Sequence, residues 1–195
     1  ESSIENANQS IALLFTNLNR AAELITSFKQ VAVDQTNDKV RLINMAKYLD
    51  EIIQSLHPKL KKTSHSIKIH CDDNIEIYSH PGAIAQIVIN LVINSVIHGF
   101  ENMNRGEIAI SIALADKRLT LDYKDNGKGL PREQLPLLFD AFFTTKADNG
   151  GSGLGTHIIK NLVIDTLNGQ ITANNLQTGG LHFHIEFPDM RYALS

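Results

Sequence analysis

The sequence predicts an α+β fold: a two-layer sandwich of a mixed, mainly antiparallel sheet with helices on one face. Two patterns indicate it. Short segments of alternating apolar and polar residues recur along the chain, as in strands with one buried face, and longer helical segments lie between them. The composition agrees, because 43% hydrophobic and 20% charged residues in a chain of 195 are typical of a folded globular protein.

A long helix is predicted for residues 1–35. Its apolar residues follow a seven-residue repeat: Ile4, Ala7, Ile11, Leu14, Leu18, Ala21, Ile25, Phe28 and Ala32. This repeat is typical of a helix in a coiled coil or bundle, and an amphipathic helix lying on the globular domain is the alternative. A helix of this length, at ~1.5 Å per residue, cannot bury its stripe against itself. We therefore expect a helix that needs a partner helix, followed by one globular domain over residues 36–195.

The globular domain is predicted to consist of short elements. Strands are expected at 40–45, 67–70, 75–78, 107–113, 119–123, 170–174 and 182–187, and helices at 46–60, 81–99 and 156–167. The second helix opens with Pro81, which suits a first turn, and stops near Gly99. A turn around Asp116 and Lys117 joins two strands. Residues 126–155, rich in Gly, Asp and Asn, predict a long loop that contains a short helix.

The charge and cysteine content narrow the class of protein. A net charge of −3 argues against nucleic acid as a partner, and the one local basic run, at 59–62, is interpreted as a solvated helix end. Cys71 is the single cysteine, so no internal disulfide forms, which fits a reducing, cytoplasmic compartment. The longest apolar run, 87–97, falls short of the ~20 residues of a membrane helix. Because the chain starts at Glu1 within a helical pattern, we expect a fragment of a longer protein, and membrane anchoring of that protein stays open.

Three polar residues form a stripe on the apolar helix that follows Pro81. Asn90, Asn94 and His98 are four positions apart and share one helix face. A buried amide costs free energy unless it is hydrogen-bonded. Backbone groups in a core could satisfy one such residue. Three aligned polar residues are better explained by a polar ligand, with an amide oxygen available to a hard cation.

Two glycine-rich segments follow. Residues 125–129 end a predicted strand, and the Asp125 carboxylate could accept a hydrogen bond from an exocyclic amine such as that of adenine, although the same residues also fit a tight turn. Residues 150–155 lead directly into the last predicted helix. Backbone N–H groups at a helix start bind phosphate, although a flexible linker has the same composition.

In this order, the three features resemble the nucleotide-binding boxes of the ATPase superfamily shared by DNA gyrase, heat-shock chaperones, mismatch-repair ATPases and histidine kinases. Residues 90–98 resemble the asparagine box, 125–129 the first glycine box and 151–155 the second. Residues 138–146 resemble the phenylalanine box of histidine kinases, and the helix at 1–35 resembles the second helix of the kinase dimerisation hairpin. Gly179 and Gly180 resemble the end of the family's closing hairpin.

The resemblance implies a role for each site residue. Asn94 would ligate Mg²⁺, Asn90 would contact phosphate, and His98 would lie near the phosphates or the adenine edge. Asp125 would hold the adenine amino group, helped by Gly127 and Gly129. The phosphates would meet backbone N–H groups of Gly151, Gly153, Leu154 and Gly155. Phe139, Phe142 and Phe143 would anchor a lid, and Lys146 would reach the γ-phosphate unless it is simply an exposed lysine.

The activity implied is that of a protein-histidine kinase. It would transfer the γ-phosphate of ATP to a histidine on its own phosphoacceptor helix, for relay to the receiver domain of a response regulator, within a homodimer of the full-length protein. None of the eight histidines has the family's acceptor context, so the acceptor is expected upstream of Glu1. This fragment should therefore bind ATP without phosphorylating itself.

The chain departs from the family pattern at two places. Ile97 stands where many of these kinases carry a lysine, so Lys146 or Lys128 would have to supply the missing charge, and Thr156-His157 replaces a more usual apolar pair. The alternatives are a hydrolytic ATPase of the same superfamily and a non-catalytic dimerisation or scaffold module. His182 and His184 share one face of a strand, where a metal site is conceivable, but without an evident third ligand surface histidines are the favoured interpretation.

Overall fold

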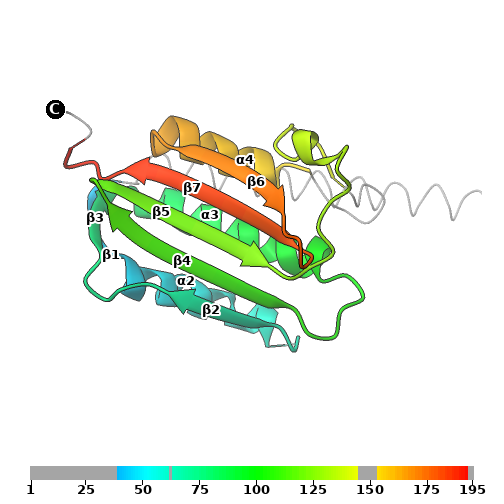
Figure 1. Ribbon diagram of the computed structural model, residues 1–195. Helices are drawn as coiled ribbons and strands as arrows, with labels where there is room; N and C mark the ends of the chain where they lie inside the picture. Colours follow the sequence, from blue (N-terminus) through cyan, green and yellow to red (C-terminus); the bar gives the residue numbers. More distant parts are fainter. Residues whose placement is uncertain (1–38, 62, 145–152, 193–195) are drawn as a thin grey trace, which may run out of the picture.

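The computed structural model describes residues 39–61, 63–144 and 153–192. They form a five-stranded sheet in the order β2-β4-β5-β7-β6, with α2, α3 and α4 packed on one face and no described element on the other (Figure 1). The predicted α+β sandwich with helices on one face is therefore confirmed. The helix predicted for residues 1–35 lies outside the described residues.

The strands and helices of the globular domain lie within a few residues of their predicted positions. The strands are β1 (Arg41–Asn44), β2 (Ser66–His70), β3 (Glu76–Ser79), β4 (Glu107–Ala115), β5 (Arg118–Asp125), β6 (Gln170–Asn175) and β7 (Leu181–Pro188). The helices are α2 (Met45–Leu60), α3 (Pro81–Asn94) and α4 (Gly155–Asn161). The short helix expected in the long loop is a 3₁₀ turn, Leu135–Leu137.

The sheet is mixed, as predicted. β2 pairs parallel with β4, and every other pair in the five-stranded sheet is antiparallel. Asp116 and Lys117 both have positive φ, which is the conformation that a two-residue turn needs to match the twist of a hairpin. β2 and β3 follow one another in sequence but do not pair with each other, because β3 pairs with β1 in a separate two-stranded sheet.

The buried carboxylate of Asp189 joins the two sheets. Asp189 follows β7, and it is 1% exposed. Its Oδ1 accepts hydrogen bonds from the N–H groups of Tyr78 (3.2 Å), in β3, and of Arg191 (3.0 Å). The Arg191 side chain donates to Oδ2 and, at 3.1 Å, to the carbonyl oxygen of Glu76. The C-terminal end of β7 is thereby tied to the outer strand pair.

The helix α3 lies in the core. Its residues Ala83, Ile84, Ile87, Val88, Leu91 and Val92 are buried, and it packs against α2 and α4. Together with the π-helical turn Ser95–Gly99 it spans 19 residues with a mean hydropathy of 1.5, enough by length and composition for a membrane helix. The expectation that no segment reaches that length was therefore wrong. Of this segment 39% is buried, and the six buried residues of α3 belong to the core of the domain.

Candidate functional site

Asp125 is a buried carboxylate at the end of β5. Buried and less buried residues alternate along β5, so Asp125 faces the helices together with Tyr123 and is 4% exposed. Its Oδ1 accepts hydrogen bonds from the backbone N–H groups of Gly127 (2.9 Å) and Leu181 (3.2 Å). Its Oδ2 accepts one from the Ser95 hydroxyl at 2.7 Å. Three of the about four acceptor positions of the carboxylate are thus filled, and one on Oδ2 is left for a donor.

Glycines allow backbone to approach Asp125 closely. A Cβ on Gly180, which has φ +92°, would lie 1.9 Å from the carbonyl oxygen of Asp125. A Cβ on Gly127 would lie 2.7 Å from the carbonyl oxygen of Gly99. A Cβ on Gly99 would lie 3.7 Å from the carboxylate of Asp125, within van der Waals contact. The absence of side chains at Gly127 and Gly180 lets neighbouring backbone segments pack closely around Asp125.

A buried hydroxyl chain links Asp125 to the end of the apolar helix. The Tyr123 hydroxyl lies 2.8 Å from Ser95 Oγ and 3.1 Å from the carbonyl oxygen of Leu91. Because Ser95 donates its proton to Asp125, Tyr123 donates to one of these two oxygens. Burial raises the pKa of Tyr123 well above 10.0, and the negative charge of Asp125 adds to the effect, while the hydrogen bond to Ser95 opposes it. These hydrogen-bonded hydroxyl groups hold the Asp125 carboxylate in a fixed orientation.

Asn90 and Asn94 lie on the same face of α3. The Asn90 Oδ1 accepts a hydrogen bond from Gln86 at 3.0 Å, but its Nδ2 is buried and has no partner within the described residues. The Asn94 amide is partly buried and lies against Gly155, where a Cβ would come within 3.2 Å of Asn94 Oδ1. The side-chain amide of Asn94 makes no hydrogen bond in the part of the chain that the structure describes. An unpartnered buried donor is costly without a ligand.

The helix does not remain regular as far as His98. A π-helical turn, Ser95–Gly99, follows Asn94, and such turns are frequent at functional sites. The predicted alignment of His98 with Asn90 and Asn94 assumed a regular α-helix, and the place of His98 in the site stays a prediction. Ser95 and Gly99, the first and last residues of the turn, both lie against Asp125.

The start of α4 and the loop before it complete the group. Gly155, the first residue of α4, lies against Asn94, and a Cβ on Gly153 would lie 2.5 Å from the carbonyl oxygen of Phe142. The His157 Nδ1 lies 3.1 Å from the carbonyl oxygen of Phe139, which ties α4 to the loop. Phe139 packs edge-on against Phe183 in the core. The residues following β5, the end of α3 and the start of α4 therefore form a connected set.

The remaining predicted site residues differ in exposure and in their contacts. Phe142 is 68% exposed, so it does not anchor the loop in this structure. Ile97 is 47% exposed, and Lys128 is paired with Glu101 at 2.7 Å, which engages one of the two lysines expected to replace the missing charge. Gly129, with a positive φ, lies against Asn175 and against the carbonyl oxygen of Gly180. Lys146 and Gly151 lie outside the described residues.

Sequence reasoning missed several members of the site. Ser95 was not predicted as a site residue, and its position next to Asn94 was the one signal of a role. Leu181 contributes a backbone N–H, which no side-chain pattern reveals. His157, whose role was unclear from the sequence, connects α4 to Phe139 and to Asn161 Nδ2 at 3.2 Å.

Comparison with known proteins agrees with this arrangement. Residues 79–191, more than half of the chain, match the model of the family described as "Histidine kinase-, DNA gyrase B-, and HSP90-like ATPase". The sensor protein DegM of a Bacillus species is 27% identical over 177 residues, which cover 90% of this chain and 45% of DegM. This chain thus spans less than half of that relative.

Solved structures share the fold. The catalytic domain of histidine kinase ThkA superposes with a TM-score of 0.68 at 24% identity, over 77% of this chain and 96% of that domain. ThkA in complex with the response regulator TrrA superposes with a TM-score of 0.68 at 21% identity, over 88% of this chain and 49% of that chain. Full-length ShkA in complex with AMPPNP superposes with a TM-score of 0.70 at 19% identity, over 87% of this chain and 36% of that chain. From the match over residues 79–191, the chain belongs to the family of histidine kinase-, DNA gyrase B- and HSP90-like ATPases.

Proposed function

We propose that this chain is the ATP-binding catalytic domain of a sensor histidine kinase, which transfers the γ-phosphate of ATP to a histidine for relay to a response regulator. Family membership supports nucleotide binding, and the name of DegM supports a sensor protein. The structures of ShkA with AMPPNP and of ThkA with TrrA support a nucleotide and a response regulator as partners. The observation that carries the proposal is Asp125, a buried carboxylate with one acceptor position left.

Asp125 would recognise the adenine base. Its remaining acceptor position on Oδ2 suits the exocyclic amino group, and Gly99 places no side chain against the carboxylate. The fixed orientation given by Ser95, Gly127 and Leu181 means that little entropy is lost when the base binds. The buried carboxylate would be the main determinant of base specificity.

Asn94 and Asn90 would meet the magnesium ion and the phosphates. The Asn94 amide offers an oxygen of the kind that Mg²⁺ prefers, and a single protein ligand suffices because phosphates and waters supply the others. The buried Asn90 Nδ2, which has no partner within the described residues, would donate to a phosphate oxygen. The backbone of Gly151, Gly153, Leu154 and Gly155 before α4 would hold the remaining phosphate oxygens, with Lys146 near the γ-phosphate.

The chain's part in the reaction would be positioning and neutralisation of charge. Phosphoryl transfer needs few covalent contributions from the protein. The acceptor histidine would belong to a helix upstream of Glu1. Residues 1–35 would be the second helix of the hairpin that carries it, and the full-length protein would be a homodimer with this domain in the cytoplasm.

A phosphotransfer assay in trans tests the proposal. The chain is incubated with Mg·ATP labelled at the γ-phosphate and with a longer version of the protein that carries the upstream helix and the Asp125→Asn substitution. We expect label to appear on the longer protein as an acid-labile phosphohistidine. The matched control is the same mixture in which both proteins carry Asp125→Asn, and it should remain unlabelled.

Two results would overturn the proposal. Release of inorganic phosphate without labelling of the longer protein would identify a hydrolytic ATPase of the same family. A failure to bind Mg·ATP at all, measured by calorimetry, would favour a scaffold module.

A further inference from the structure

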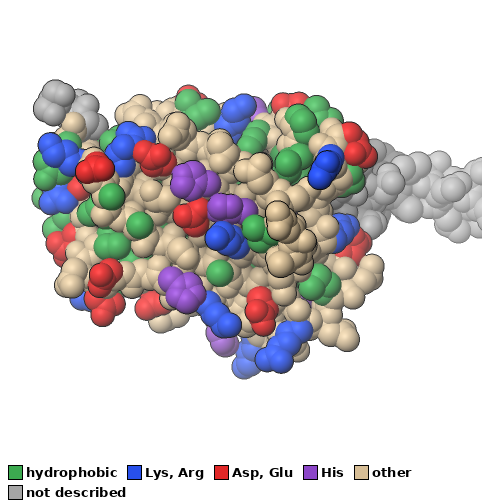
Figure 2. Space-filling view, in the orientation of Figure 1, with side chains coloured by type: hydrophobic (Ala, Val, Ile, Leu, Met, Phe, Trp, Pro, Cys, Tyr) green, Lys and Arg blue, Asp and Glu red, His purple; other side chains and the backbone are tan. Residues whose placement is uncertain are grey.

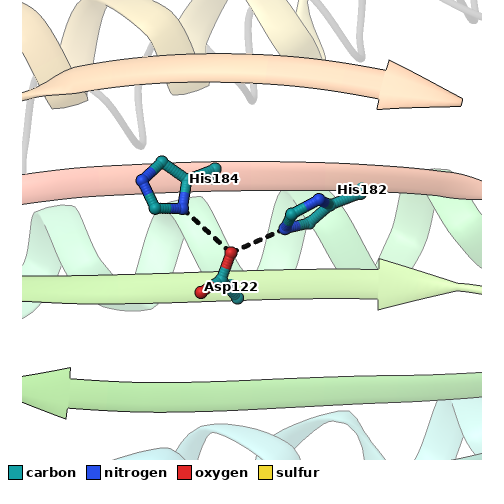
Figure 3. Close-up of side chains that lie close together, drawn as sticks. All are labelled: Asp122, His182 and His184. Atoms are coloured by element: carbon teal, nitrogen blue, oxygen red, sulfur yellow. Dashed lines mark hydrogen bonds and ion pairs between the residues drawn. The ribbon is translucent and has the colours of Figure 1, made fainter. Parts of the chain in front are cut away.

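A second group of chemically active side chains lies on the open face of the sheet. His182 and His184 of β7 point toward Asp122 of β5 (Figure 3). Asp122 Oδ1 lies 2.6 Å from His182 Nε2 and 2.9 Å from His184 Nδ1. The space-filling view shows histidine side chains gathered beside an acidic side chain near the middle of this face (Figure 2). We call Asp122, His182 and His184 the sheet-face cluster.

The strand pairing explains how the cluster forms. Asp122 is directly opposite His184 in the antiparallel pair of β5 and β7. His182, two positions before His184, emerges on the same face because side chains alternate along a strand. Asp125, three positions after Asp122, faces the helices instead. The cluster and the candidate nucleotide site therefore lie on opposite faces of the same strand.

The donor atoms of the cluster match those of a transition-metal site. One ligand atom from each of the three residues can be chosen so that all lie within 4.8 Å of one another, and no other group of three such residues is found among the described residues. In a tetrahedral zinc site with bonds of ~2.0–2.1 Å, neighbouring ligand atoms are ~3.3 Å apart. Asp122 Oδ1 lies 2.6 and 2.9 Å from the two histidine nitrogens, so these atoms have to move apart only slightly to bind an ion, which side-chain rotation allows.

The surroundings admit an ion from solvent. The side chains of His182, His184 and Asp122 are 25%, 41% and 29% exposed. Two imidazole nitrogens and one carboxylate oxygen are a set that selects zinc-like ions over Mg²⁺, which prefers oxygen ligands alone. The hydrogen bonds of Asp122 already hold both rings with a nitrogen toward the site, so the ligands are oriented before the ion arrives.

We propose that Asp122, His182 and His184 bind one divalent transition-metal ion of the zinc type, with water completing its coordination. The ion takes the place of the protons that the two facing nitrogens now share with Asp122. It links β5 to β7 on the face opposite Asp125. This site is independent of nucleotide binding.

A zinc titration of the whole chain tests the proposal. Zn²⁺ is titrated without nucleotide and in an excess of Mg²⁺, with a chromophoric chelator as competitor, and Co²⁺ absorption reports the coordination geometry. We expect one saturable site and a rise in Tm with Zn²⁺. His182→Gln and His184→Gln should each weaken binding by no less than the ~10–100-fold that loss of an outer-shell partner costs.

The controls are residues on the neighbouring edge of the sheet. His70→Gln and Cys71→Ser remove the potential ligands of β2 and its end, and both should leave the zinc affinity unchanged. Melting curves without metal verify that the His182 and His184 variants are folded. If one of these variants does not fold, Asp122→Asn takes its place. Zinc affinity equal to that of the unaltered chain in the folded variants, or the absence of a saturable site, overturns the proposal.

Discussion

At the residue level, the chemistry of the candidate site depends on a carboxylate that the protein itself nearly saturates. Asp125 accepts three hydrogen bonds from the chain, and the fourth position is proposed for adenine. The sequence predicted Asp125 and the flanking glycines, because an acid at a strand end followed by glycines is a local pattern. It could not predict Leu181 as a partner, since that contact joins residues far apart in the chain and uses only the backbone.

Replacing Asp125 with Asn should separate binding from folding. The amide oxygen can still accept from Gly127 and Leu181, and the amide NH₂ can donate to Ser95 Oγ, but no acceptor remains for an exocyclic amine. We expect ATP affinity to fall by roughly 10- to 150-fold, from the ~1.5–3 kcal/mol of a hydrogen bond to a charged group. Calorimetric titration measures the loss. Asp116→Asn, in the turn at the other end of β5, is the matched control and should bind ATP normally.

Tyr123 offers a test by pH. Its raised pKa means that the neutral hydroxyl is favoured in the folded chain, so its contribution is complete below the ordinary value of 10.0 and is lost as the pH rises through the folded value. Tyr123→Phe should lower the free energy of unfolding by ~1 kcal/mol at neutral pH. The difference from the unaltered chain should shrink above pH 10, as measured by denaturant unfolding. An equal difference at all pH values would contradict the hydrogen-bonded role of Tyr123.

At the level of elements, periodicity predicted the helices and strands well. The alternation of apolar residues is a local property, so the positions of β4, β5 and β7 followed from it. The π-helical turn Ser95–Gly99 did not, because the residues alone do not reveal the extra residue. Pairing between distant strands was equally hidden. That is why Asp122 escaped notice as a third partner of His182 and His184.

The two glycines in the turn before β7 should differ in their effect on stability, because only at one of them would a Cβ also collide with other backbone. Gly179 and Gly180 both have φ near +90°, so alanine strains the backbone at either position. Only at Gly180 would the new Cβ collide with the backbone of Asp125. Gly180→Ala should therefore lower the stability and the ATP affinity more than Gly179→Ala, as measured by chemical denaturation and calorimetry. Equal losses in the two variants would indicate that the collision is relieved elsewhere.

At the level of the whole molecule, Asp189 connects the outer strand pair to the main sheet. Burial opposes its ionisation, but hydrogen bonds from the Arg191 side chain and from backbone N–H groups lower its pKa overall. A lowered pKa gives a contribution to stability that is complete above the ordinary value of 3.8 and is lost as the pH falls through the folded value. The connection that Asp189 makes between the outer strand pair and the main sheet should therefore weaken in acid.

Asp189→Asn is expected to remove this acid sensitivity. The variant should lose ~1–3 kcal/mol at neutral pH, because the charge-assisted bonds of Arg191 are weakened. The loss relative to the unaltered chain should become smaller as the pH falls below 3.8. Urea unfolding at a series of pH values measures both effects. Asp165→Asn, at an exposed position in the turn after α4, is the control. It should change neither the stability at neutral pH nor its dependence on pH.

In the proposed kinase domain as a whole, the buried carboxylate of Asp125 recognises the amino group of adenine. Adenine presents an amino group where guanine presents a carbonyl oxygen, which a carboxylate repels. The most direct test is calorimetric titration of the unaltered chain with Mg·ATP and with Mg·GTP under the same conditions. We expect Mg·ATP to bind at least about 10-fold more tightly, in keeping with ~1.5 kcal/mol or more for the hydrogen bond to Asp125. Equal affinity for the two nucleotides, or tighter binding of Mg·GTP, would contradict the account.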